Sequence, residues 1–197
     1  MKSAKEYRMI AKESLKGNWG AAIGVTVVFS LITGALACTW LGWLILGGAM
    51  LCGLAFVFMA AIREKKVTFE NLFEGFKKPE FSATIGLYVK TMIFTLLWTL
   101  LFYIPGIIAV FKYSMAPYIL MDHPELTGGE AITASKELMK GKKWKLFCVE
   151  FSFIGWCLLG TLTFGILYLW ICPWMQATVA AFYEDIKDEV VLPAKAE

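Results

Sequence analysis

The sequence predicts an all-α membrane protein: a polytopic helix bundle whose six spans form three hairpins, with amphipathic helices on its cytoplasmic surface. Three observations predict this fold. The 197 residues are 58% hydrophobic and 18% charged, whereas soluble domains contain about 25% charged residues. Uncharged apolar runs long enough to cross a bilayer, about 20 residues, follow one another along the chain. Short basic clusters separate these runs, in the pattern expected of cytoplasmic loops.

We expect one membrane domain over residues 1–185 and a polar cytoplasmic tail over residues 186–197. Within that domain, three surface helices alternate with three membrane hairpins. The expected surface helices span residues 1–17, 68–78 and 127–141. The expected hairpins span residues 18–62, 82–122 and 144–184.

Residues 1–17 are typical of a basic helix that lies on a membrane surface. Ser3 and Glu6 are spaced as in a capping box, and Gly17 ends the pattern. A cleaved signal peptide is the alternative, because residues 35–38 read ALAC. The long amphipathic segment and the spanning length of the next apolar run favour retention as a first membrane helix.

Residues 68–76 show the clearest amphipathic pattern in the chain. Four apolar side chains recur at helical spacing, at Phe69, Leu72, Phe73 and Phe76. Thr68 is the expected N-cap. Two placements are open: the helix lies in the membrane interface, or it packs on the bundle.

The stretch over residues 102–122 decides the number of spans. Pro105 and Gly106 either kink one long helix or turn the chain back across the membrane. The run after them, residues 107–121, is short, because at about 1.5 Å per residue it reaches only about 23 Å. A turn places the basic residues 136–145 on the side of the amino terminus, whereas a kink places them outside. The positive-inside rule therefore favours a turn at Pro105 and Gly106.

The last third of the chain follows the same plan of a surface helix and two spans. Thr127 and Glu130 are spaced as in a second capping box. Residues 144–162 and 166–183 form the last two apolar runs. Glu184 then marks the return to the cytoplasmic side.

A short similarity joins the first and last thirds. Residues 12–19 read KESLKGNW and residues 136–144 read KELMKGKKW. In both stretches a basic helix ends in Lys-Gly, and a tryptophan precedes a span. The similarity indicates either a threefold internal repeat or the independent reuse of interface chemistry.

Four polar side chains inside the predicted spans are candidate functional residues, because ionisable groups within a membrane are costly. They are Lys112, Gln176, Lys90 and Glu150. The side chain of Lys112 is the hardest to explain structurally, although it would also be satisfied by reaching the outer interface. Lys90 and Glu150 lie near the cytoplasmic side, where they either pair with each other or extend to the headgroups.

Prolines in two predicted spans are expected to kink their helices. Pro117 lies in the fourth span and Pro173 in the sixth, and each frees a backbone carbonyl for neighbouring polar groups. Gln176 and Thr178 follow Pro173. The two kinked helices either line a polar cavity or only shape the bundle.

No catalytic motif accompanies these residues. The sequence has no Walker A, G-x-S-x-G, H-E-x-x-H or G-x-G-x-x-G pattern, so we expect no enzyme activity. The five cysteines lie in apolar runs and are expected to be buried thiols. Asp122, His123 and Glu125 suit a turn better than a metal site, because they crowd into four residues. We therefore expect no metal or other cofactor.

Stretches over nearly the whole chain, densest from residue 100 to 185, carry a family resemblance. They read LKGNWG (15–20), IPGI (104–107), YSMA (113–116), WKLF (144–147), FIGW (153–156) and FYED (182–185). In these stretches the chain resembles the bacterial integral membrane family catalogued as domain of unknown function 975. The resemblance implies a six-span protein of the bacterial inner membrane and no established activity.

The leading hypothesis is a noncatalytic protein of the bacterial cytoplasmic membrane with both termini in the cytoplasm. Its basic surface helices are expected to bind anionic lipid headgroups. A membrane protein, a cytoplasmic protein or a second copy of the chain is the alternative partner, and no nucleic-acid partner is expected. The second hypothesis is a small transporter or channel with a polar path near Lys112 and Gln176.

Overall fold

The structure, a computed structural model, describes residues 2–37, 40–77, 81–101 and 103–190. Within these ranges every regular element is a helix, which confirms the predicted all-α class. The first third forms α1 (Ala4–Ser14), α2 (Trp19–Ala37) and α3 (Trp40–Glu64). The middle third forms η1 (Phe69–Phe73), α4 (Glu74–Lys77), α5 (Phe81–Leu101), α6 (Tyr103–Tyr113) and α7 (Ala116–Asp122). The last third forms α8 (Gly128–Leu138), α9 (Lys143–Phe151), α10 (Ile154–Leu162), α11 (Tyr168–Ile186) and η2 (Lys187–Glu189).

Three segments among the described residues are long and apolar enough to cross a membrane. They are Trp19–Leu36, Leu46–Glu64 and Lys143–Leu162. A fourth candidate span is obtained if the segment from η1 through α4 and the following helix α5 are counted as one span with a bend of 85° between them. This criterion supports three to four spans and not the predicted six. The predicted fourth span is divided between α6, with 11 residues, and α7, with 7, which are too short singly.

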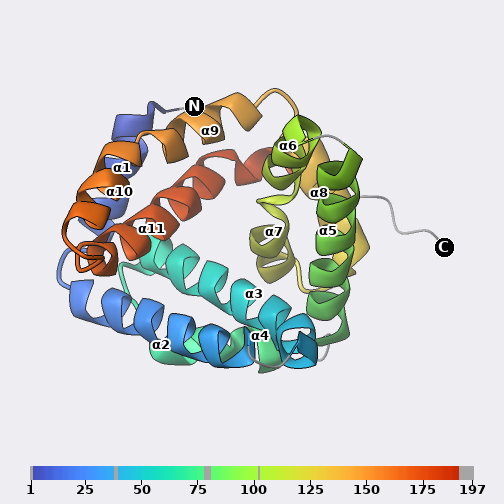
Figure 1. Ribbon diagram of the computed structural model, residues 1–197, viewed down its shortest axis with the longest axis horizontal. Coiled ribbons are helices and arrows are strands. Elements are labelled where there is room, and N and C mark those ends of the chain that lie inside the picture. The colour runs from blue at the N-terminus through green and yellow to red at the C-terminus, as the bar shows by residue number, and fades with distance from the viewer. Residues whose placement is uncertain (1, 38–39, 78–80, 102, 191–197) are drawn as a thin grey trace.

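Helices α3 and α11 form the centre of the bundle. In Figure 1 they run through the interior of a ring made by the other helices, and they contact each other. In the segment Leu46–Glu64, 72% of the residues are buried, against 17% in Trp19–Leu36. Helix α2 therefore presents most of its apolar surface to the surroundings, as a helix facing lipid does.

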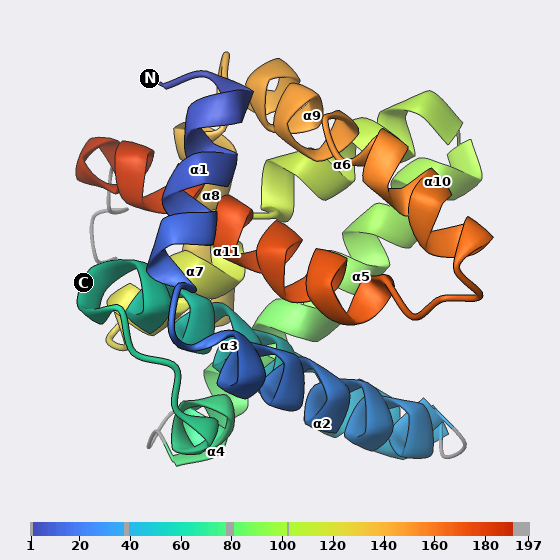
Figure 2. The same ribbon diagram turned by 90° about the vertical axis from the view of Figure 1, so that its left-hand side faces the viewer.

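Consecutive long helices pack against each other as hairpins. Helix α2 packs along α3, α5 along α6, and α10 against α11. The Asn18 side-chain amide donates to the backbone carbonyl of Lys65 at 2.7 Å, which holds the start of α2 beside the end of α3. In Figure 2, α1, α4 and α8 lie toward the left of the bundle, and the turn from α10 to α11 lies at the right.

Pro105 and Gly106 do not form the predicted turn. Helix α6 already begins at Tyr103, so Pro105 and Gly106 lie in its first turn and not at the reversal. Helix α5 ends at Leu101 and α6 packs along it from Tyr103, and residue 102 lies outside the described ranges. Proline fits the first turn of a helix, because the amide that it lacks has no helical acceptor there. A side chain at Gly106 would collide with Thr99, so this glycine permits α6 to approach α5.

A helix with the predicted capping box forms in the first expected surface segment, over Ala4–Ser14. The Ser3 hydroxyl accepts from the Glu6 amide and the Glu6 carboxylate accepts from the Ser3 amide, completing the capping box. Tyr7, Ala11 and Leu15 are fully buried. Figure 2 shows α1 lying across the end of the bundle, and its buried face packs on α11.

The predicted helix over residues 68–78 divides into η1 and α4, and residue 78 lies outside the described ranges. Thr68 makes no side-chain cap. Leu72 is fully buried, but Phe69 and Phe73 are 45% and 42% exposed. The segment packs on α3, because Gly53 lets the Leu72 carbonyl come close to the α3 backbone. Close backbone contact at Gly53 and burial of Leu72 together position the segment on the bundle, the second of the two placements left open by the sequence.

The third expected surface helix, α8, has its capping box between Thr127 and Glu130. One face of α8 is buried against α5 and α7, including Ile132, Ser135 and Leu138. The helix is thus a packed part of the bundle end and not a detached surface element.

Candidate functional site

A cavity of about 290 Å³ lies among α3, α7, α9 and α11. Its walls are mostly apolar, with Leu51, Leu54 and Ala55 contributed by α3. The polar side chains that line it are Ser114, Tyr118, Glu150 and Gln176. Two of the candidate residues, Glu150 and Gln176, therefore meet in one cavity although they are distant in sequence.

Three of the polar side chains that line the cavity have no hydrogen-bond or ion-pair partner within the described protein. Within the described ranges, the side chains of Tyr118, Glu150 and Gln176 make no hydrogen bond or ion pair with other residues. Ser114 differs, since its hydroxyl donates to the carbonyl of Phe111 at 3.0 Å. A partly buried polar group without a partner calls for an explanation, and a ligand is one.

One helix interruption and one continuous helix bring these residues together. Helices α6 and α7 are separated at Ser114 and Met115, and Pro117 follows in the first turn of α7. Helix α11 instead continues through Pro173. In α11 the Thr178 hydroxyl donates to the Trp174 carbonyl at 2.7 Å, whereas Gln176 faces the cavity.

The break between α9 and α10 forms a third wall of the cavity. It falls at Ser152 and Phe153, inside the predicted fifth span. The Ser152 hydroxyl donates to the Val149 carbonyl, a bond that competes with regular helix geometry. The Arg8 guanidinium donates to the Ser152 carbonyl at 3.0 Å and lies over the Phe153 ring, 5.7 Å from its centroid. Helix α1 thus supports this wall from outside.

The two candidate lysines lie away from the cavity lining. Lys112 is partly buried near the end of α6, where its backbone carbonyl accepts from the Ser135 hydroxyl at 2.8 Å. Lys90 is exposed on α5, beside Gly129 at the start of α8. Among the described residues no ion pair joins Lys90 to Glu150, so the first of the two alternatives for these residues, mutual pairing, is not formed.

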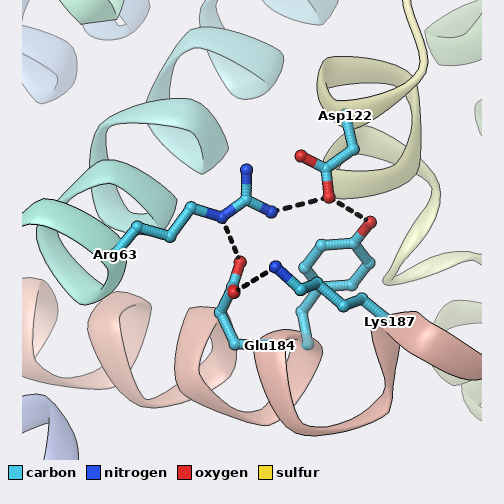
Figure 3. A network of polar contacts seen from close by, with 5 residues as sticks. Arg63, Asp122, Glu184 and Lys187 are labelled. Atoms are coloured by element: carbon cyan, nitrogen blue, oxygen red, sulfur yellow. Dashed lines mark hydrogen bonds and ion pairs between the residues drawn. The ribbon is translucent and has the colours of Figure 1, made fainter.

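A second polar centre joins the ends of three helices (Figure 3). Arg63 on α3 donates from Nη2 to Asp122 on α7 at 2.7 Å, and from Nε to Glu184 on α11 at 2.6 Å. The Tyr183 hydroxyl donates to the same Asp122 oxygen at 2.8 Å. Lys187 pairs with the other Glu184 oxygen at 2.8 Å. We call these five residues the end cluster.

The charges of the end cluster balance, with two cations and two carboxylates. Partial burial alone would raise the pKa of Asp122, but hydrogen bonds from Arg63 and Tyr183 outweigh it and hold the pKa below its ordinary value. The carboxylate is therefore ionised at neutral pH. Such a neutral, mutually satisfied cluster suits a structural clamp better than a ligand site.

Sequence reasoning missed the end cluster as a unit, although a signal was present. Arg63, Asp122 and Glu184 are each the first charged residue where a predicted span returns to the cytoplasmic side. Three charges of both signs at one membrane face are the expected components of an ion-pair network. Their contact requires only that the second, fourth and sixth spans end side by side.

The amino-terminal helix is tied to α11 by a similar group. Asp185 accepts from Lys2 Nζ at 3.0 Å and from the Tyr7 hydroxyl at 2.7 Å. Burial would raise the pKa of the Asp185 carboxyl, yet these two donors bring it below its ordinary value. Burial, together with the bond to Asp185, raises the pKa of Tyr7. The Trp174 indole also donates to the Arg8 carbonyl at 2.9 Å.

The residues considered for a metal do not converge. His123 Nδ1 lies 3.2 Å from Glu125, while Asp122 faces Arg63 and Tyr183. Within the described parts of the chain, no group of three or more His, Cys, Asp or Glu side chains is placed to hold a metal ion. Cys52 is buried, and Cys148, Cys157 and Cys172 are partly buried free thiols. Cys38 lies outside the described ranges.

Fold and site together define an all-α protein with helices of membrane-spanning length, clamped at one end by ion pairs and containing a partly polar cavity. The chain belongs to the family described as "Protein of unknown function (DUF975)", which it matches over residues 1–111 and 92–190. This finding confirms the family resemblance read from the sequence. Comparison with curated proteins gave no match. Comparison with solved structures gave none either.

Proposed function

We propose that this chain is a noncatalytic, six-span protein of the bacterial cytoplasmic membrane that binds anionic lipid headgroups at its cytoplasmic face. Both termini lie in the cytoplasm in this proposal. The protein belongs to a family of unknown function and has helices that can cross a membrane. The finer statements rest on the placement of its charges.

Contacts between the predicted cytoplasmic ends support six spans. Asn18 touches Lys65, and Arg63 joins Asp122 and Glu184. These contacts bring together the start of the first proposed span and the ends of the second, fourth and sixth. The short fourth span, α6 with α7, is tolerable where the bilayer thins locally.

The outward face of α1 is the observation that carries the headgroup proposal. Lys5, Met9, Lys12 and Lys16 follow one another at helical spacing, and all four are exposed. The opposite face is buried on the bundle. An amphipathic helix with cations on its exposed face, lying across the end of a membrane bundle, is suited to anionic headgroups.

A surface hollow of about 400 Å³ lies on the same helix. It is lined by Met9, Lys12, Glu13, Lys16 and Trp19. Two ammonium groups, those of Lys12 and Lys16, are available there to a phosphate. The indole of Trp19 lies beside them, and tryptophan is enriched at membrane interfaces. The carboxylate of Glu13 is the one opposing charge among these five residues.

Lipid binding by purified protein tests this proposal. Replacing Lys5, Lys12 and Lys16 by Gln should weaken binding of phosphatidylglycerol, because each lysine near an anionic surface contributes about 1 kcal/mol. Phosphatidylcholine should bind equally to both proteins. The control replaces Lys65 and Lys66, two exposed cations off α1, by Gln. Equal phosphatidylglycerol binding by the triple variant and the parent would contradict the proposal, and would favour a protein partner or a second copy.

The cavity favours a second candidate function, a small transporter or channel. It places Glu150 and Gln176 together beside Pro117, as a polar path through a membrane would require. Solute flux into proteoliposomes tests it, with Glu150→Gln and Gln176→Leu as variants at the cavity lining. Flux that both substitutions leave unchanged would count against a path through these residues.

A further inference from the structure

We propose that the cavity among α3, α7, α9 and α11 binds a small organic cation, of the quaternary ammonium class. This inference goes beyond headgroup binding by α1. It names the ligand class for the cavity invoked by the second candidate function, but it requires only binding and not transport.

The charge of Glu150 is the first reason. Its side chain lines a mostly apolar cavity and makes no ion pair among the described residues. A carboxylate withdrawn from water is costly unless a cation accompanies it. Arg8, the cation placed over Phe153, is already bonded to the Ser152 carbonyl. A positively charged ligand would supply the missing partner of Glu150.

The aromatic side chains are the second reason. Tyr118 and Phe153 both line the cavity. Aromatic rings beside a carboxylate are the chemistry that recognises quaternary ammonium groups, since the ring faces attract a cation that cannot donate hydrogen bonds. One side of the Phe153 ring is covered by the guanidinium of Arg8, and one side of the Tyr118 ring is stacked on Tyr183, so a ligand cation would contact the ring surfaces that line the cavity.

The size and the remaining polar groups narrow the ligand further. A cavity of about 290 Å³ with walls such as Leu51, Leu54 and Val179 accepts a compact ligand with methyl groups. The side chains of Tyr118 and Gln176, which bond to no other described residue, are available to a hydroxyl or carbonyl carried by that ligand. A metal cation fits poorly, because Ca²⁺ takes about 6–8 oxygen ligands and the cavity offers one carboxylate.

Calorimetric titration of the purified full chain with choline chloride tests the inference. Choline carries a trimethylammonium group and one hydroxyl, and 3,3-dimethylbutan-1-ol is its uncharged isostere. We expect choline to bind the parent at least tenfold more tightly than the isostere. Glu150→Gln should weaken choline binding at least tenfold, whereas Glu137→Gln, at an exposed carboxylate on α8, should leave it unchanged.

A second variant keeps the test decisive if Glu150→Gln does not fold. Ala55→Leu adds bulk to the α3 wall and leaves Glu150 in place, so it should also weaken choline binding. Absence of choline binding to the parent, equal affinity for the isostere, or an affinity that neither variant changes would overturn the inference. Choline binding without flux would sustain it and reject transport. If Glu150→Gln binds phosphatidylglycerol as tightly as the parent does, lipid binding by α1 is independent of the cavity, and the two proposals are tested separately.

Discussion

Replacing Arg63 by Met should destabilise the protein by about 2–3 kcal/mol. Arg63 makes two charge-assisted hydrogen bonds, to Asp122 and Glu184, and bonds of this kind contribute about 1.5–3 kcal/mol each. The sum is reduced because the Arg63 side chain is 32% exposed and water screens it. Both carboxylates are about 85% withdrawn from solvent, as their exposed fractions of 16% and 15% indicate, so losing their shared cation remains costly.

The assay is reversible unfolding in mixed micelles, with Lys187→Met as the matched control. Lys187 pairs with Glu184 three residues earlier on the same chain, and such pairs contribute about 0.2–0.5 kcal/mol. A double-mutant cycle of Arg63→Met with Asp122→Asn should give a coupling free energy of about 1–2 kcal/mol. If Arg63→Met destabilised the protein no more than Lys187→Met, the end cluster would not be a clamp.

Three further predictions concern pH, packing and capping. The pKa values of Asp122 and Asp185 are lowered in the folded state. The two ionised carboxylates therefore stabilise the fold above their unfolded-state pKa of about 4. This stabilisation is lost as the pH falls through their folded-state pKa values. Unfolding free energy should therefore decrease below about pH 4, and an increase there would refute the sign. Gly53→Ala should lower the free energy of unfolding by about 1–3 kcal/mol, seen as a lower thermal midpoint, because its Cβ would meet the Leu72 carbonyl. Gly20→Ala, with open space around it, should leave the midpoint unchanged. Ser3→Ala should cost about 1 kcal/mol of local stability in α1, measured by amide exchange at Glu6, and unchanged exchange would exclude the cap.

Local chemistry made part of the fold predictable. The capping boxes at Ser3 and Thr127 and the buried face of α1 follow from side chains a few residues apart, and the structure contains all three. The length and composition of α2 and α3 likewise identify membrane-length helices. These features depend on residues close in sequence, where spacing alone determines which groups meet.

Features that depend on distant contacts were not predictable in detail. The start of α6 at Tyr103 and the break at Ser152 lie where distant elements meet, α5 with α6 and Arg8 with Ser152. Neither contact is visible in a local pattern. Glu150 and Gln176 were identified as unusual polar residues, but their shared cavity depends on the crossing of α9 and α11. Tyr118 gave no signal, because a tyrosine in an apolar run is ordinary.

Topology mapping with a membrane-impermeant maleimide tests the central claim, a six-span bundle with its charged ends in the cytoplasm. Phe164 is 99% exposed at the turn between α10 and α11 and would report the outer side of the membrane. Lys140 is exposed after α8 and would report the inner side. Each is replaced by Cys and compared with the parent, whose own cysteines set the background. We predict labelling of Phe164→Cys in intact cells, and of Lys140→Cys only after the membrane is permeabilised. Labelling of Lys140→Cys in intact cells, or protection of Phe164→Cys, would contradict the proposed topology.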